Sequence, residues 1–271
     1  MEVGGVVNDC DRVLVLGDTH GDFVWIGTVL RIARDLGITY AFQLGDFGIW
    51  PGPPGRVFLD QVCKATEKNG VTLYAMTGNH DDQEQIAGFE ASPDADGFVT
   101  LGANLRWVPR GARWVWNGVV FGALGGAFSI DWRHRVSGVS WWRIAEEAQA
   151  DDVTRLGRKR LDVLFTHDAP EGAQPVQAST LGPSDESQSQ VSRVRIREAV
   201  EATRPRLVVH GHWHVRQTRV FSITQGTQSV RVEGLASDQE RDGGAWGILE
   251  LPSLEFTDGR EPKWQQRRLE R

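Results

Sequence analysis

Two patterns of apolar and polar positions alternate along the first 76 residues of the chain. Short apolar runs predict buried strands at 12–16, 40–44 and 71–76. Between these runs, apolar residues recur at helical spacing over 24–36 and 56–69. Gly37 and the pair Asn69-Gly70 follow the helical segments as C-terminal stop signals. Three successive strand–helix units predict a largely parallel sheet with helices on its faces.

The rest of the chain favours shorter strands. They are predicted at 105–108, 114–116, 119–124, 161–165 and 207–209, before a β-rich stretch over 215–251. Asn117-Gly118 predicts a tight hairpin, and helices are expected over 140–150 and 194–203. These elements predict an α/β fold of two packed mixed β-sheets flanked by helices. We expect one domain over residues 1–271, with its core at about 12–251.

Two segments depart from this pattern. Residues 171–190 contain no Lys or Arg and are rich in Gly, Pro, Ser and Gln, which predicts a flexible loop. The loop follows the candidate metal ligand His167, so two interpretations remain open: a lid over the site, or a plain mobile loop. The basic end of the chain, about 260–271, is interpreted as a solvated tail.

Composition and charge narrow the class of protein. The net charge is -6, so the chain lacks the excess of basic residues that is typical of proteins that bind duplex nucleic acid. No run of about 18 apolar residues occurs, so no membrane-spanning helix is expected. The first residues lack the pattern of a secretory signal, and two cysteines are too few for a disulfide framework. We therefore expect a cytoplasmic protein.

Five short polar motifs carry the candidate chemistry, and each follows a predicted strand. They are Gly17-Asp18-Thr19-His20-Gly21-Asp22, Gly45-Asp46, Gly78-Asn79-His80-Asp81, Thr166-His167-Asp168 and Gly211-His212-Trp213-His214. In α/β sheets, ligands bind beyond the carboxyl ends of strands. Aspartate, asparagine and histidine offer oxygen and nitrogen donors that suit Mn, Fe, Zn or Ni. The motifs together predict a metal site.

The ordered motifs resemble those of the calcineurin-like metallophosphoesterase superfamily over about residues 12–216. The resemblance implies an αββα sandwich with two divalent ions, manganese being the first expectation and Fe, Zn or Ni the alternatives. It implies one ion on Asp18, His20, Asp46 and His214, and a second on Asp46, Asn79, His167 and His212. His80 would contact the phosphate and assist the leaving group, and Asp81 would orient His80.

The implied reaction is attack of a metal-bridging hydroxide on a phosphodiester or phosphomonoester, with the diester favoured. The second motif reads Gly45-Asp46-Phe47-Gly48-Ile49-Trp50 and lacks the acid and arginine of protein Ser/Thr phosphatases. One alternative is a metal-dependent nuclease on short single strands, with tryptophans as stacking platforms. The other is a non-catalytic interaction module, which the intact set of ligand residues disfavours. The expected partner is a phosphate-ester substrate, a nucleotide being one candidate.

Several neighbouring residues have two interpretations. Asp22 is expected to cap the helix that follows it, and His210 is expected to be buried behind the ligands. Arg133 and Arg135 could bind a phosphate through their planar guanidinium groups, with Trp141-Trp142 walling a base pocket. The alternative is a surface arginine cluster over a packed tryptophan pair, and both interpretations remain open.

Overall fold

The computed structural model describes residues 4–7, 10–176, 181–223, 226–240 and 243–260. The helices are α1 (Phe23–Asp35), α2 (Gly52–Asn69), α3 (Gln83–Glu90), η1 (Trp132–His134), α4 (Ala150–Leu156) and α5 (Pro183–Thr203). One sheet has the described strands, in spatial order, β1 (Gly4–Val7), β7 (Arg113–Trp116), β8 (Val119–Leu124), β9 (Val163–Thr166), β10 (Leu207–His210), β12 (Gln228–Gly234) and β11 (Gln217–Ile223). The other has β14 (Phe256–Asp258), β13 (Trp246–Glu250), β2 (Arg12–Leu16), β3 (Tyr40–Gln43), β4 (Thr72–Ala75), β6 (Leu105–Trp107) and β5 (Val99–Gly102).

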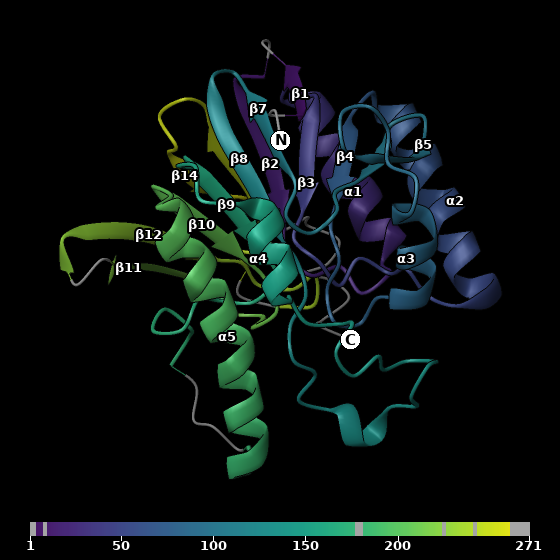
Figure 1. Ribbon diagram of the computed structural model, residues 1–271. Coiled ribbons are helices and arrows are strands. Elements are labelled where there is room, and N and C mark those ends of the chain that lie inside the picture. The colour runs from purple at the N-terminus through teal and green to yellow at the C-terminus, as the bar shows by residue number, and fades with distance from the viewer. Residues whose placement is uncertain (1–3, 8–9, 177–180, 224–225, 241–242, 261–271) are drawn as a thin grey trace.

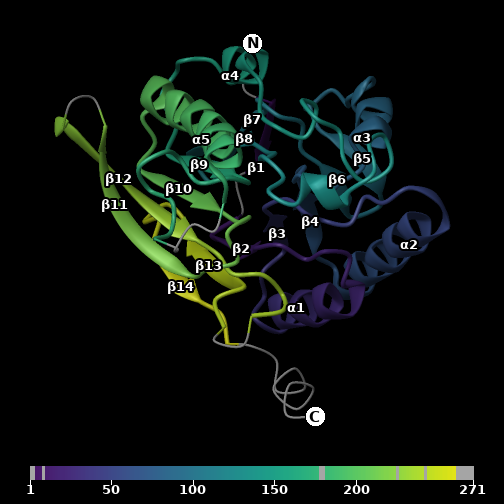
Figure 2. The same cartoon turned by 90° about the horizontal axis from the view of Figure 1, so that it is seen from below.

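The two sheets pack face to face, and helices cover their outer faces (Figures 1 and 2). Alternation along β2 shows why: Val13 and Val15 enter the core between the sheets, whereas Leu14 and Leu16 enter the core under α1 and α2. Successive side chains of a strand point to opposite faces, so a continuous apolar run is the pattern of a strand buried on both sides. The predicted α/β fold is confirmed.

Aromatic side chains fill the space between the sheets. The Phe42 ring of β3 lies 5.6 Å from the Trp114 ring of β7 and 4.3 Å from the Phe165 ring of β9, measured between centroids. All three side chains are fully buried. Such rings bury large apolar areas and lock the two sheets together.

Both sheets have parallel strands at their centres, which fixes where the polar motifs meet. In one sheet β2, β3 and β4 run parallel, and in the other β8, β9, β10 and β12 run parallel. The predicted β7–β8 hairpin is present. β1 and β14 pair at the edges of the sheets, so the sheets extend beyond the predicted core of 12–251.

Two sequence predictions need correction. The helix expected over 140–150 is wrong, because residues 140–149 form turns and α4 begins at Ala150. The Glu146 carboxylate accepts hydrogen bonds from the Trp141 indole and the Trp142 backbone, and these hold the segment in a non-helical path.

The flexible loop predicted over 171–190 is also wrong in its second half. α5 begins at Pro183, with Asp185 and Glu186 in its first turn. Proline in the first turn and acidic residues near the N-terminus both favour a helix start. Residues 177–180 of that loop lie outside the described residues, as does the predicted tail from 261. In the described part of the chain, no helix combines the length and apolarity needed to cross a membrane.

Candidate metal centre

The polar motifs converge where the carboxyl ends of parallel strands from both sheets meet. Asp18 follows β2, Asp46 follows β3 and Asn79 follows β4, whereas His167 follows β9 and His212 follows β10. Residues nearly 200 positions apart are in direct contact: the His212 backbone N–H donates to Asp18 Oδ1 over 2.9 Å. The site therefore depends on the packing of one sheet against the other.

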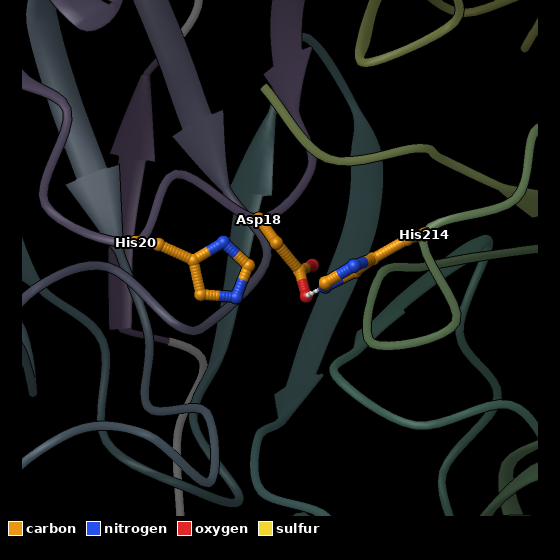
Figure 3. Close-up of side chains that lie close together, drawn as sticks. All are labelled: Asp18, His20 and His214. Carbon is orange, nitrogen blue, oxygen red and sulfur yellow. Dashed lines mark hydrogen bonds and ion pairs between the residues drawn. The ribbon is translucent and has the colours of Figure 1, made fainter. Parts of the chain in front are cut away.

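One ligand group consists of Asp18, His20 and His214 (Figure 3). The Asp18 carboxylate is fully buried, and its Oδ2 lies 3.1 Å from His214 Nε2. The His20 and His214 ring centroids are 4.9 Å apart. One donor atom from each of the three residues lies within 4.8 Å of the others, so together they could hold a cation.

Asp46 joins this group to a second one. Its Oδ2 lies 3.5 Å from His20 Nε2, and its Oδ1 lies 3.4 Å from His167 Nε2. Asp46 occurs in one candidate group with His20 and His80, and in another with Asp18 and His167. A carboxylate with one oxygen toward each histidine is the arrangement expected of a ligand shared by two cations.

His167 is held with its Nε2 facing the other donors. Its Nδ1 donates to the Leu44 carbonyl over 2.8 Å, which turns Nε2 toward the other donors. That nitrogen lies 3.0 Å from Asn79 Oδ1. His212 falls outside the three carboxylate–histidine groups, but its ring centroid is 5.1 Å from that of His167. The second expected ligand set is therefore brought together beside Asp46. Its other members are Asn79, His167 and His212.

The electrostatics of the cluster favour bound cations. Burial opposes ionisation of Asp46, but His167 and His80 outweigh it and hold its pKa well below the ordinary value. Burial opposes a charge on His20, yet Asp238 and Asp46 raise its pKa to about 11. Carboxylates that hold a proton on a neighbouring histidine this strongly also attract dications, and metal binding would displace that proton. By contrast, burial lowers the pKa of His212 to about 4, so its ring is neutral and ready to ligate.

The backbone around the ligands is strained. His20, Asp46, His212 and His214 adopt positive φ values of 40°, 53°, 64° and 53°. Such conformations are uncommon outside glycine and persist where the surroundings enforce them, often at functional sites. Gly78 permits the close approach of two motifs, since a Cβ there would clash with the Asp46 backbone and carboxylate.

His80 lies at the edge of the cluster, where it can meet a substrate. Its backbone N–H donates to Asp46 Oδ1 over 2.8 Å, and its Nε2 lies 3.9 Å from Asp46 Oδ2. The ring is half exposed, unlike the buried carboxylates. Burial, together with Arg135, lowers the pKa of His80 despite the nearby Asp46.

Asp81 makes different contacts from those expected of a residue that orients His80. Its carboxylate accepts hydrogen bonds from the backbone N–H groups of Phe47, Gly48, Ile49 and Gly78 over 2.8–3.2 Å. It therefore braces the loop after β3 against the loop after β4. Asp81 positions the backbone on either side of Asp46, and its described contacts do not include the His80 ring.

The two arginines have separate environments. Arg135 Nη2 lies 2.6 Å from His80 Nε2, and Arg135 Nη1 donates to the Asn79 carbonyl over 3.1 Å. Arg133 forms an ion pair with Asp185 of α5 and stacks 4.5 Å from the Trp132 ring. Only Arg135 therefore touches residues of the cluster, while Arg133 ties η1 to α5. Trp141 stacks on Trp132, and neither Trp141 nor Trp142 lines the cavity beside the ligands.

Other sequence expectations have clear outcomes. Asp22 caps α1 by accepting hydrogen bonds from the backbone N–H groups of Val24 and Trp25. His210 is fully buried, and its Nδ1 lies 2.9 Å from the Gly211 carbonyl. Both expectations are confirmed.

Three supporting residues were not identified from the sequence. Asp238 Oδ1 lies 3.7 Å from His20 Nδ1, and the Asp238 backbone N–H donates to the Asp18 carbonyl. Asp168 accepts hydrogen bonds from the Trp213 indole and the Ser192 hydroxyl, which joins the last two ligand loops to α5. Ser129 Oγ accepts a hydrogen bond from the Asn79 amide. Asp238 lies four residues after β12, in a loop that follows a strand as the loops of the candidate ligands do.

A cavity of about 660 Å³ opens beside the cluster. Asp46, Asn79, His80, His212 and His214 form one wall, and residues within 172–176, Leu181, and residues of α5 and β11 form much of the rest. A cavity of this volume encloses a small organic ligand. The candidate ligands therefore face a space that can admit a small molecule.

Comparison with known proteins agrees with this geometry. Residues 11–216 match the family of calcineurin-like phosphoesterases, and a search of curated proteins gives no significant match. The fold is similar to the protein TT1561 of Thermus thermophilus (TM-score 0.55, 11% identity, 93% of this chain and 100% of that chain). It is also similar to a dimetal phosphatase from Danio rerio (TM-score 0.51, 12% identity, 89% and 92%). These identities indicate a shared fold alone. The family match spans most of the sequence and includes every candidate metal ligand, and the chain belongs to the calcineurin-like phosphoesterase family.

Proposed function

We propose that this protein hydrolyses phosphate esters, phosphodiesters in preference to monoesters, at a centre that holds two divalent cations. The observation that carries the proposal is the position of Asp46, whose two carboxylate oxygens face His20 on one side and His167 on the other. Asp18, His20, Asp46 and His214 would hold one ion. Asp46, Asn79, His167 and His212 would hold the second, with manganese as the first expectation.

Two such cations supply an activated water and neutralise charge on the phosphoryl oxygens. The chain itself contributes orientation and proton transfer. His167 is fixed by Leu44, and Asn79 is fixed by Ser129, so these donors need little rearrangement. His80, at the exposed edge of the cluster, would assist the departing oxygen, and a positioned acid–base group contributes roughly 10²–10⁴-fold in rate.

The cavity supports the preference for diesters. A phosphodiester carries an organic group on each side of the phosphorus, so one group remains to be bound while the other departs. The cavity beside the ligands has the volume for such a group, about 660 Å³.

The test is a paired hydrolysis assay on chelator-stripped protein resupplied with Mn²⁺. The substrates are bis-p-nitrophenyl phosphate and p-nitrophenyl phosphate, and bound metal is counted in the same samples. We expect metal-restored turnover that favours the diester. The exposed Asp35→Asn variant is a matched control that should behave like the original protein.

Two results would redirect the assignment. Two bound ions without hydrolysis of either ester would contradict the proposal and favour the interaction-module alternative. Salt-sensitive cleavage of short oligonucleotides in preference to both esters would favour the nuclease alternative.

A further inference from the structure

The cavity beside the metal centre has a far wall that ester hydrolysis does not itself require. Ile130 follows β8, Pro175 and Val176 precede α5, and Arg219 lies on β11, the edge strand that projects from the body in Figure 1. These segments come from outside the ligand motifs. The far wall is therefore a feature of this chain, separate from the donors that bind metal.

Part of this wall is apolar and exposed. Ile130 is 52% exposed and Val176 is 86% exposed, although both line a concave surface. The Trp213 ring, between the two ligand histidines of its motif, also lines the cavity. Binding sites for small molecules are mostly apolar, with a few polar groups that set orientation. An apolar organic group seated here would remove these side chains from water.

The wall also contains two arginines, Arg193 and Arg219, which differ in whether nearby carboxylates compensate their positive charge. Arg193 is almost fully buried, and its guanidinium donates to Glu171, Glu186 and Ser189. Its charge is thus compensated within the protein. Arg219 donates from Nε to Gln217 Oε1 over 2.9 Å. Across the described ranges of the chain, no carboxylate lies within ion-pair distance of Arg219.

We propose that the far wall binds the organic group of the substrate and that Arg219 binds a second anionic group carried by it. The substrate class is a small phosphodiester with an apolar organic group that bears a carboxylate or a further phosphate. The identity of the reacting phosphate rests on the proposed function, whereas the charge preference rests on Arg219.

The net negative charge of the protein opposes a preference for anionic ligands, so such a preference would be strong support for the role of Arg219. The protein carries a net charge of -6, so its general field disfavours an added negative charge on the ligand. A preference for the more anionic ligand then requires a local cation. Arg219 is the cavity arginine whose charge is not offset by a described acid.

The experiment measures binding of aryl phosphonates, whose P–C bond is not hydrolysed. Two lengths are used, one phenyl ring or two, and each carries either a para-carboxylate or the neutral carboxamide of similar shape. Affinities are measured by titration calorimetry with Mn²⁺ present. We expect the carboxylate to bind about tenfold more tightly than the carboxamide for at least one length, as for a charge-assisted hydrogen bond.

The variants assign the preference to a residue. Arg219→Gln should reduce the carboxylate-to-carboxamide ratio to about one, and Arg219→Lys should retain part of it. Arg195→Gln, on the exposed surface of α5 and outside the cavity lining, should leave the ratio unchanged. Thermal unfolding of each variant verifies that it is folded.

Equal binding of both probes at both lengths by the original protein would overturn the inference, as would a ratio that survives in folded Arg219→Gln. Neither result depends on turnover. Failure of the proposed function would instead appear as absence of metal-dependent ester hydrolysis, with the carboxylate preference still measurable.

Discussion

Asp238 is predicted to support metal binding through His20 without touching the metal. Its Oδ1 lies 3.7 Å from His20 Nδ1, while His20 Nε2 faces Asp46. Carboxylates behind ligating histidines fix the ring and strengthen the ligand. The substitution Asp238→Asn keeps the side-chain shape and the backbone hydrogen bond to the Asp18 carbonyl. It removes only the charge and one acceptor.

The structure sets the magnitude of the effect. Two unit charges about 4 Å apart interact by about 4 kcal/mol at an effective dielectric constant of 20, which is an upper limit for this contact. Loss of a supporting carboxylate typically weakens metal affinity by about 10–100-fold, or roughly 1.4–2.7 kcal/mol. We expect a loss in that range for the ion held by His20 and a smaller one for the ion beside His167.

Stepwise Mn²⁺ titration of chelator-stripped protein by calorimetry separates the two ions. Asp35→Asn is the control, because Asp35 pairs with Arg34 on the exposed face of α1. Unchanged affinity for both ions in Asp238→Asn would refute the reasoning. An equal loss for both ions with a lowered melting temperature would also refute it, because it would indicate general damage to the fold.

Two further predictions concern turnover and pH. His80→Ala should leave two ions bound while turnover falls by about 10²–10⁴-fold, as measured by metal content and diester hydrolysis; an unchanged rate would exclude the assigned role. Burial and the neighbouring Glu146 raise the pKa of Glu147 from 4.5 to about 7. The folded state therefore binds this proton more tightly than the unfolded state, so its stabilisation is complete below pH 4.5 and is lost as the pH rises through about 7. Thermal unfolding of Glu147→Gln at pH 5 and pH 8 should show a smaller loss of stability than the original protein, by about 1–2 kcal/mol after allowance for solvent screening; equal losses would contradict this.

The central strands could be located from sequence because their burial is simple. The runs at 12–16, 40–44 and 71–76 correspond to β2, β3 and β4 within one or two residues at each end. Each is apolar on both faces, since one face meets the other sheet and the opposite face meets helices. A continuous apolar run set by burial on both faces therefore predicts the position of a strand with little ambiguity.

The segments that escaped prediction depend on tertiary contacts. Residues 140–149 contain apolar positions at helical spacing, but Glu146 draws hydrogen bonds from Ser129, Trp141 and Trp142 into a turn. The first half of α5 has few apolar residues, although its start at Pro183 has the proline and acids of a helix N-terminus. Its Asp185 pairs with Arg133, 52 positions earlier, which no local pattern reveals.

The candidate site was also predictable from the sequence only in part. Most candidate donors were identifiable because they lie beside glycine or at the end of an apolar run, and His214 because it follows His212 by two positions. Their supports were not, because Asp168 and Asp238 act through Trp213 and His20 from other loops. Asp81 shows the limit most clearly: the family resemblance implied that it orients His80, whereas its carboxylate accepts four backbone hydrogen bonds.

In the proposed function, one carboxylate, Asp46, serves two cations. The most direct measurement is anomalous diffraction from crystals of the protein grown or soaked with Mn²⁺. We expect two anomalous peaks about 3.5–4 Å apart, with the Asp46 carboxylate coordinating both, and loss of both peaks or strongly reduced occupancy in Asp46→Asn. A single peak, or two peaks with Asp46 bound to neither or only one, would contradict it.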